Sequence, residues 1–214
     1  MAIELFFVRH GEVDAHWRGR LYGCLDIKLS DNGRLEAQRA AAFLAKQPLA
    51  AVVSSGLSRT RYGAAHVARG RNLEELHDPR LREIDRGDWC GLTFEELADQ
   101  VPGGMDAWRA AAWSMRPPNG ENMADVAERV CEVLDELAER YSGQAVCVVV
   151  HSHVIRAALA RALPADKVLD LDLPTGAIVH VDWSASGPAL LQWLHTFATE
   201  APIPAAAVLA GLPS

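Results

Sequence analysis

The segment from Ala145 to Val150 consists of six consecutive apolar residues. It is rich in β-branched valine, which favours a strand, and it is far shorter than the roughly 20 residues that a membrane-spanning helix needs. A strand without a polar side must be covered on both faces, as in the parallel sheets of α/β proteins. The segment from Ile3 to Val8 is also mainly apolar, with Glu4 as its one charged residue. The sequence therefore predicts a mostly parallel sheet packed between layers of helices.

Helical periodicity alternates with short strand-like runs along the rest of the chain. Long helices are predicted at 31–47, 58–69, 121–141 and 154–163, with Ser58 as the cap of the second. Further strands are predicted at 50–54, 73–77, 177–182 and 189–194. The expected architecture is α/β, a three-layer αβα sandwich. We expect one domain over residues 1–214 with a small helical cap insertion at roughly 84–145, in which short helices start near Thr93 and run through Trp108 and Trp113.

Composition excludes several other classes of protein. Half of the 214 residues are apolar and 23% are charged, which is typical of a globular domain and not of a disordered chain. The net charge is −7 without a block of Lys or Arg, so nucleic acid and anionic membranes are not expected partners. The start of the chain does not resemble a secretory signal, and the four cysteines form no C-x-x-C pair. We therefore expect a cytoplasmic protein with reduced thiols.

Basic side chains follow three of the predicted strands. Arg9 and His10 end the first strand, Arg59 begins the helix after the second, and His151 and His153 follow the apolar strand. Because parallel strands end at one edge of a sheet, these side chains should meet there. Arginine forks suit phosphate oxygens, and histidine can act as a nucleophile near neutral pH. The sequence predicts an anion site, with Gly11 allowing close approach of the backbone to the ligand.

Each of these residues also has an ordinary structural explanation. Arg59 could be a plain first-turn residue, and His151 a hydrogen-bonded histidine at a strand end. Arg156, inside the following helix, is interpreted as a structural ion-pair partner rather than a ligand contact. A metal hydrolase that uses His151 and His153 is a further hypothesis, but no Asp/Glu cluster with supporting spacing accompanies them. The sequence therefore predicts no metal site and no cofactor.

Six segments resemble, in order, the motifs of the histidine phosphatase superfamily, whose fold is also called phosphoglycerate-mutase-like. The first is F-V-R-H-G-E at 7–12, followed by L-Y-G-C-L-D-I-K-L-S at 21–30 and S-S-G-L-S-R-T at 54–60. L-R-E-I-D-R-G-D-W-C-G at 81–91 resembles the acid-bearing loop, and P-N-G-E-N at 118–122 and H-S-H-V-I-R at 151–156 match later motifs. The resemblance spans most of the chain.

The resemblance implies a role for each matching residue. His10 would take the phosphoryl group on a ring nitrogen, while Arg9, Arg59 and His151 would bind the phosphoryl oxygens. Glu83 would protonate the leaving alcohol and then help to activate water. Expected further contacts are the backbone amide of Ser152 and a substrate pocket with contributions from Tyr22, Gly23, Arg86 and His153.

The chain departs from the family pattern at several positions. Where the family often has a phosphate-contacting Asn after R-H-G-E, this chain has Ala15 and His16, and His16 is the candidate replacement. Ser152 stands where a glycine often follows the second histidine. Arg86 replaces an aromatic or aliphatic residue, and Cys90 replaces a Glu. These departures bear on substrate choice more than on the core chemistry.

Two activities divide such families, phosphatase and cofactor-dependent phosphoglycerate mutase. A mutase needs cap cations to retain its intermediate. Between the acid-bearing loop at 81–91 and His151, the sequence offers only Arg109 and Arg116 outside the long helix. We therefore expect a phosphatase of a small phosphomonoester, with α-ribazole 5′-phosphate as the first candidate. A mutase and a non-catalytic phospho-ligand-binding module remain the alternatives, and a homodimer is compatible with the sequence.

Overall fold

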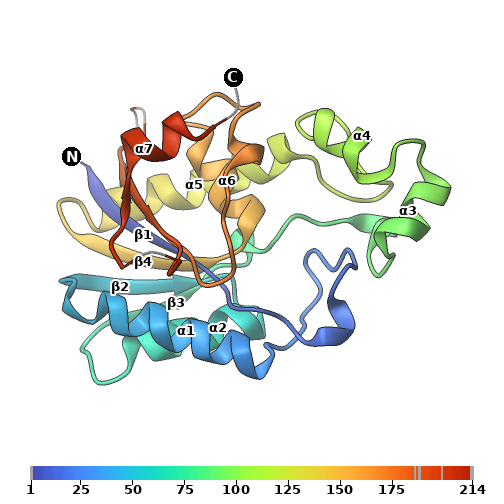
Figure 1. Ribbon diagram of the computed structural model, residues 1–214. Helices are drawn as coiled ribbons and strands as arrows, with labels where there is room; N and C mark the ends of the chain where they lie inside the picture. Colours follow the sequence, from blue (N-terminus) through green and yellow to red (C-terminus); the bar gives the residue numbers. More distant parts are fainter. Residues whose placement is uncertain (1, 186, 188, 199, 213–214) are drawn as a thin grey trace.

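The computed structural model describes residues 2–185, 187, 189–198 and 200–212. Its centre is a seven-stranded sheet in the order β3-β2-β4-β1-β5-β6-β7 (Figure 1). The strands are β1 (Ile3–Arg9), β2 (Leu49–Ser54), β3 (Glu74–His77), β4 (Ala145–Val150), β5 (Ile178–Trp183), β6 (Leu190–His195) and β7 (Ile203–Pro204). The α-helices are α1 (Asp31–Phe43), α2 (Ser58–Ala68), α3 (Phe94–Gln100), α4 (Gly104–Ala110), α5 (Met123–Arg140), α6 (Ser152–Leu159) and α7 (Ala205–Ala210).

The sheet has a parallel half and an antiparallel half. Strands β3, β2, β4 and β1 run parallel to one another, whereas β5, β6 and β7 are each antiparallel to the preceding neighbour in the sheet. A short loop joins β5 to β6, and a connection of that length can link only antiparallel strands. The predicted α/β class with a mostly parallel sheet is confirmed, and the sheet as a whole is mixed.

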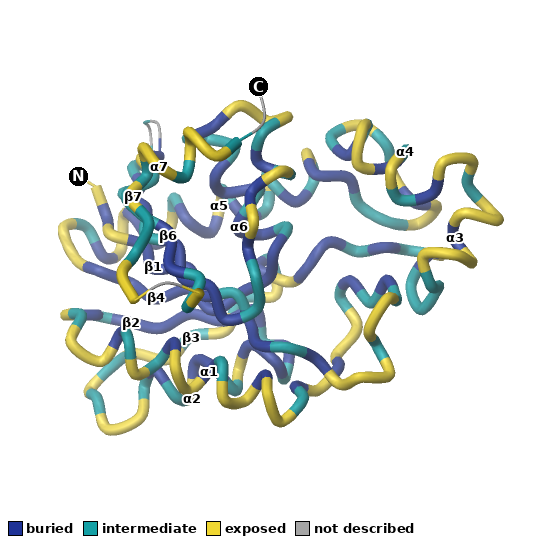
Figure 2. The backbone as a smooth tube through the Cα atoms, viewed as in Figure 1, coloured by how far each residue is buried: buried dark blue, intermediate teal, exposed yellow. Residues whose placement is uncertain are grey.

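Helices cover both faces of the parallel half, as the apolar strands require. Phe6 and Val8 of β1 pack in one buried cluster with residues of α1 and α2. Leu5 and Phe7 point to the opposite side and pack with residues of α5 and α6. Side chains alternate between the faces of a strand, so the consecutive apolar residues at 5–8 supply both clusters. Figure 2 shows β1, β2 and β4 mostly buried at the centre of the molecule.

Helix starts follow local capping chemistry, with two corrections to the prediction. Thr93 caps α3 in a reciprocal capping box with Glu96, as the sequence indicated. Ser58 does not cap α2: it is the first residue of that helix, and its hydroxyl donates to Asp26 instead. Helix α6 begins at Ser152 rather than Val154, because His151 takes the position before its first turn.

The cap is shorter than the segment 84–145 suggested by the sequence. Helices α3 and α4 project beyond the sheet, at the right of Figure 1, whereas α5 packs on the sheet and belongs to the main core. Trp113 lies after α4 rather than within it. The tail after Ala198 forms β7 and α7. Among the described helices, none has the length and apolar character to cross a membrane.

Candidate active site

The strand register brings the predicted basic residues together. Arg9 at the end of β1 lies level with Val150 at the end of β4, so the next residues, His10 and His151, leave the sheet side by side. Their ring centroids are 5.0 Å apart. Arg59 reaches the same place from the first turn of α2, and its Nε lies 3.4 Å from Nδ1 of His151. The edge of the sheet where parallel strands end therefore carries a compact basic cluster.

His10 is held as a neutral ring with one free nitrogen. It is 3% exposed, and its Nδ1 lies 2.7 Å from the carbonyl oxygen of Gly11. A carbonyl only accepts, so Nδ1 carries the proton and Nε2 keeps its lone pair. Burial, followed by the charges of Arg59 and Arg9, lowers the pKa of His10 to about 3. The ring is therefore an unprotonated base and nucleophile at any physiological pH.

Gly11 has a different role from the one that the sequence suggested. A Cβ at this position would lie 2.0 Å from the carbonyl oxygen of Gly33, at the start of α1. The glycine is therefore needed because two backbone segments meet there. This close packing fixes the turn that holds the carbonyl against His10.

His151 is completely buried and has a partner on each ring nitrogen. Its Nε2 lies 2.8 Å from Oγ of Ser55, and its Nδ1 accepts from Arg59. Burial and the nearby Arg59 and His10 hold its pKa well below the ordinary range. In this arrangement Nδ1 of His151 accepts a hydrogen bond, so His151 would have to be protonated at Nδ1 before it could donate to a phosphate. A phosphate dianion would favour that proton by charge attraction.

Arg59 ties the loop after β1 to the cluster. It is completely buried, and its guanidinium donates to the carbonyl oxygens of Gly23, at 2.8 Å, and Leu25. Three of its five N–H groups are used in this way, counting the bond to His151, and two remain for a ligand. Gly23 has a φ of +41°, and a Cβ there would lie 2.6 Å from the Ile84 carbonyl oxygen. The glycine is therefore required where this loop passes the acid-bearing segment.

Glu83 faces the basic cluster from the acid-bearing segment. Its Oε1 accepts from the Ile84 amide at 3.0 Å, and its Oε2 lies 3.2 Å from Nδ1 of His153. Burial raises the pKa of this carboxyl, but the attraction and hydrogen bond of His153, the neighbouring His151 and the Ile84 amide outweigh burial and hold the pKa well below its usual range. In the free protein the side chain is therefore a carboxylate.

His153 and Arg86 form a chain of contacts behind Glu83. Nη2 of Arg86 donates to Nε2 of His153 at 3.1 Å, so the proton of this ring lies on Nδ1, next to Glu83. The Arg86 guanidinium stacks on the Trp108 ring, 4.0 Å from its centroid. His153 thus binds protein side chains through both nitrogens. No group of three His, Cys, Asp or Glu that could hold a metal occurs among the residues the structure describes.

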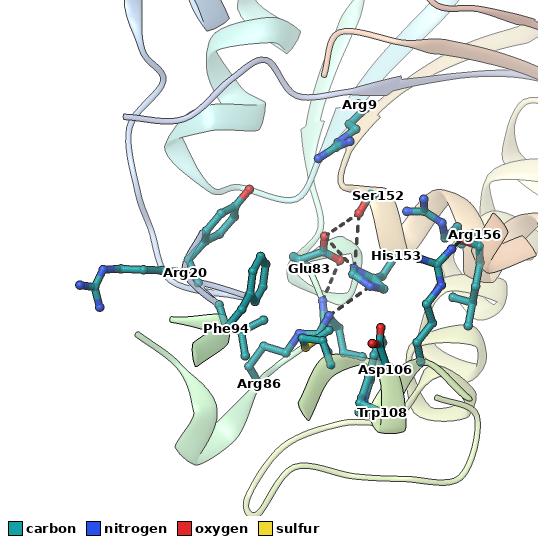
Figure 3. Close-up of a pocket in the computed structure, with 17 residues that line it drawn as sticks. Arg9, Arg20, Glu83, Arg86, Phe94, Asp106, Trp108, Ser152, His153 and Arg156 are labelled. Carbon is teal, nitrogen blue, oxygen red and sulfur yellow. Dashed lines mark hydrogen bonds and ion pairs between the residues drawn. The ribbon is translucent and has the colours of Figure 1, made fainter. Parts of the chain in front are cut away.

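A cavity of about 400 Å³ opens beside these residues and extends toward the cap (Figure 3). Figure 3 shows Arg9 and Ser152 at one end, Glu83 and His153 in the middle, and Trp108 at the other end. The predicted site residues that line it are Arg9, Tyr22, Gly23, Glu83, Arg86, Ser152 and His153. His10, Arg59 and His151 adjoin it from the sheet edge, in contact with the lining through Gly23 and Ser152.

His16 is the predicted site residue that the fold does not bring to the cavity. It lies exposed in the short helix η1 (Ala15–Trp17), with its ring against Trp17. Asp14 caps that turn by accepting from the His16 amide, which sets the course of the loop. The predicted phosphate contact of His16 therefore has no support in its position.

The cavity contains arginines that sequence reasoning missed or misread. Arg156 forms no ion pair with the residues that the structure describes: its guanidinium donates to the carbonyl oxygens of Val168 and Leu171 while lining the cavity. Arg20 lines the cavity as well. Of the two cap cations expected from the sequence, Arg109 lines the cavity and Arg116 does not; Arg116 pairs with an acid of α5. The sequence held one signal that Arg156 faces the cavity: Arg156 follows Ser152 by four residues, which places both on the same face of a helix.

Comparison with known proteins agrees with this geometry. Residues 5–196 match the model of the histidine phosphatase superfamily (branch 1). The chain is 34% identical to phosphoserine phosphatase 1 of Hydrogenobacter thermophilus over 77% of its length and 78% of the relative's.

Solved structures give the same picture. The structure of a mycobacterial glucosyl-3-phosphoglycerate phosphatase superposes with a TM-score of 0.81 at 30% identity, covering 89% of this chain and 97% of the other. The α-ribazole phosphatase from Shigella flexneri has a TM-score of 0.79 at 26% identity, with 92% and 98% covered. The chain therefore belongs to branch 1 of the histidine phosphatase superfamily.

Proposed function

We propose that this protein is a phosphomonoesterase that hydrolyses a small phosphorylated metabolite through a phosphohistidine intermediate. The observation that carries the proposal is the state of His10. Its Nδ1 is fixed by the Gly11 carbonyl, its Nε2 is free, and two arginines lie beside it. A neutral imidazole next to fixed positive charge is suited to attack a phosphate dianion. Relatives named as phosphatases of several metabolites support the reaction class.

In the first step, Nε2 of His10 attacks phosphorus, so that an N–P bond forms as the bond to the leaving oxygen breaks. We assign the binding of the phosphoryl oxygens to the phosphate end, which consists of Arg9 in the cavity lining and of His10, Arg59 and His151 at the adjoining edge of the sheet. Charge on these oxygens is best stabilised by donors that are already in place. Arg9 fits this role because its Nε is buried without a partner among the described residues. The Ser152 amide, in the first turn of α6, adds a backbone donor.

Glu83 donates a proton in the first step and accepts one in the second. It is a carboxylate in the free protein, but a bound phosphate dianion places like charge beside it and raises its pKa, so the complex takes up a proton there. That proton goes to the departing alkoxide. In the second step the carboxylate accepts a proton from water as the water oxygen attacks phosphorus, and the N–P bond breaks to restore neutral His10 and release phosphate.

The proposal requires no metal, because the arginines neutralise charge and His10 supplies the nucleophile. The substrate is a small-molecule phosphomonoester whose leaving group fits the cavity. α-Ribazole 5′-phosphate remains the first compound to assay on the basis of the sequence, and the apolar part of the lining gives its ring a surface to pack on. That part consists of Leu21, Ile84, Phe94, Met105, Trp108 and Leu169.

The test is phosphate release from a panel of phosphomonoesters, run with and without a chelator and with vanadate. We expect turnover that survives the chelator and is blocked by vanadate. A parallel assay supplies 3-phosphoglycerate with a bisphosphoglycerate primer. Rapid interconversion of 2- and 3-phosphoglycerate with little phosphate release would show a mutase and contradict the proposal, and loss of activity in chelator with recovery on metal addition would contradict metal independence.

A further inference from the structure

The end of the cavity beneath the cap carries two neighbouring hydrogen-bond donors without acceptors. Nη1 of Arg86 and Nε1 of Trp108 are both buried, and neither has a hydrogen-bond partner among the described residues. Both residues line the cavity, and the guanidinium lies 4.0 Å from the Trp108 ring centroid. We call this pair, Arg86 and Trp108, the cap end. Buried donors are rarely left unpaired, because an unmade hydrogen bond there costs about 1–3 kcal/mol.

The cavity lining also has an excess of positive charge. The lining contains five arginines, Arg9, Arg20, Arg86, Arg109 and Arg156, against two carboxylates, Glu83 and Asp106. Arg109 pairs with Asp170, whereas Arg86 and Arg156 form no ion pair with a carboxylate in the described part of the chain. Arg86 is 3% exposed, so water compensates little of its charge.

The ring of His153 cannot supply an acceptor for Nη1 of Arg86. Nε2 of His153 already accepts from Nη2 of Arg86, and Nδ1 faces Glu83. Burial lowers the pKa of His153, the Glu83 carboxylate raises it, and the charges of Arg86 and Arg156 lower it further, with a net lowering. The ring stays neutral, and Nη1 of Arg86 is left for something in the cavity.

We propose that the cap end binds a carboxylate on the leaving group, so that the substrate is the phosphomonoester of a small hydroxy acid. This inference rests on the proposed phosphatase function and specifies its substrate class. One carboxylate oxygen would accept from Nη1 of Arg86 and the other, or the same one, from Nε1 of Trp108. A charge-assisted bond of this kind is stronger than a neutral one. A single negative charge fits better than a second phosphate, because Glu83 and Asp106 already face the cavity.

The experiment compares two esters that differ only in this group: 3-phosphoglycerate, with a carboxylate, and glycerol 3-phosphate, with a hydroxymethyl group instead. The readout is the ratio of their kcat/KM values. We expect the protein to favour 3-phosphoglycerate by about 10–100-fold, the equivalent of one hydrogen bond to a charged group. α-Ribazole 5′-phosphate, which has no carboxylate, should then be a poorer substrate than 3-phosphoglycerate.

Arg86→Gln should reduce this ratio to nearly one. Because Arg86 also contacts His153, the substitution can slow both esters, and the ratio removes that common effect. Trp108→Phe keeps the ring under the guanidinium and removes only the Nε1 donor, so we expect a smaller fall, about 3–10-fold in the ratio. Arg116→Gln, which alters an exposed arginine paired with Asp125 outside the cavity lining, should leave the ratio unchanged.

The outcomes separate the two proposals. Equal kcat/KM for the two esters in the unaltered protein, or a preference that persists in both Arg86→Gln and Trp108→Phe, would overturn the carboxylate subsite while leaving the phosphatase intact. Absence of phosphate release from every ester would overturn the proposed function and this inference with it. A preference that disappears in Arg86→Gln and not in Arg116→Gln would establish the subsite.

Discussion

The two ends of the cavity differ in how the protein holds their polar groups. At the phosphate end, both ring nitrogens of His151 have partners, and Arg59 is tied to two backbone carbonyls. At the cap end, one nitrogen of Arg86 and the indole nitrogen of Trp108 have no partner in the described chain. The fold thus preorganises most of the phosphate end, where Nε of Arg9 is the buried donor without a partner in the described chain, whereas the cap end has two such donors side by side. We conclude that the fold sets the chemistry and that the ligand completes the specificity site.

The largest effect is expected at the phosphate end, where turnover should depend on His10. His10→Ala should reduce kcat by at least about 10⁴-fold, because the remaining groups bind phosphate but cannot form the intermediate. Phosphate release from an aryl phosphate measures the loss, and circular dichroism checks the fold. His16→Ala is the matched control, since it removes an exposed histidine outside the cavity lining. Activity of His10→Ala near that of the control would contradict the account.

Glu83 joins the two ends, so its variant distinguishes proton transfer from binding. Glu83→Gln keeps the size of the side chain but can neither donate nor accept the reaction proton. We expect a fall of about 10²–10⁴ in kcat/KM for alkyl phosphates. The fall should be smaller for p-nitrophenyl phosphate, whose leaving group departs without a proton. Equal losses for both classes of ester would remove Glu83 from the role of general acid.

Arg59 tests whether the phosphate end depends on shape as well as charge. Arg59→Lys keeps the positive charge but cannot hold the carbonyls of Gly23 and Leu25 together with His151. We expect kcat/KM to fall by about 10–100-fold, from the loss of one or two charge-assisted hydrogen bonds. Arg61→Lys, on the exposed side of the same helix, is the control. A rate of Arg59→Lys equal to that of the control would show that charge alone suffices.

The smallest effect concerns stability and follows from burial of neutral His10. Its pKa is about 3 in the folded protein, against an ordinary value of 6.5, so the unfolded chain binds more protons between these values. Stability must therefore fall as the pH drops below about 6.5, by about 2 kcal/mol from this residue between pH 7 and pH 5. Urea unfolding at the two values measures the change.

Two histidine variants isolate this contribution. His10→Gln should show a weaker loss of stability on acidification than the unaltered protein, because one buried neutral ring is gone. His16→Gln, which changes an exposed side chain, should keep the original slope. If His10→Gln and the unaltered protein lose stability equally, the ring is not held neutral by burial.

The phosphate end was predictable from the sequence for a physical reason. The mainly apolar strands β1 and β4 mark the parallel half of the sheet, and the residues that follow them must then emerge at the same edge. Arg9, His10 and His151 were placed together by this argument, and the structure has them adjacent. Their roles in catalysis remain predictions for the experiments above.

The cap end was not predictable in the same way. Arg86, Trp108 and His153 come from three separate segments and meet only because the cap folds against α6. No local pattern encodes such a meeting. The course of the loop around His16 was also beyond local rules, because Asp14 decides it by capping a single turn. Ser58 shows the same limit, since its hydroxyl binds a distant Asp26 and does not cap its own helix.

The most direct test of the central claim is to trap the intermediate. The protein is mixed with a phosphomonoester labelled on phosphorus, quenched within milliseconds in alkali and in acid, and digested for peptide mapping. The account predicts label on the peptide that contains His10, stable in alkali and lost in acid, as expected of a phosphoramidate. Label that survives acid, or that maps to a peptide without His10, would contradict it.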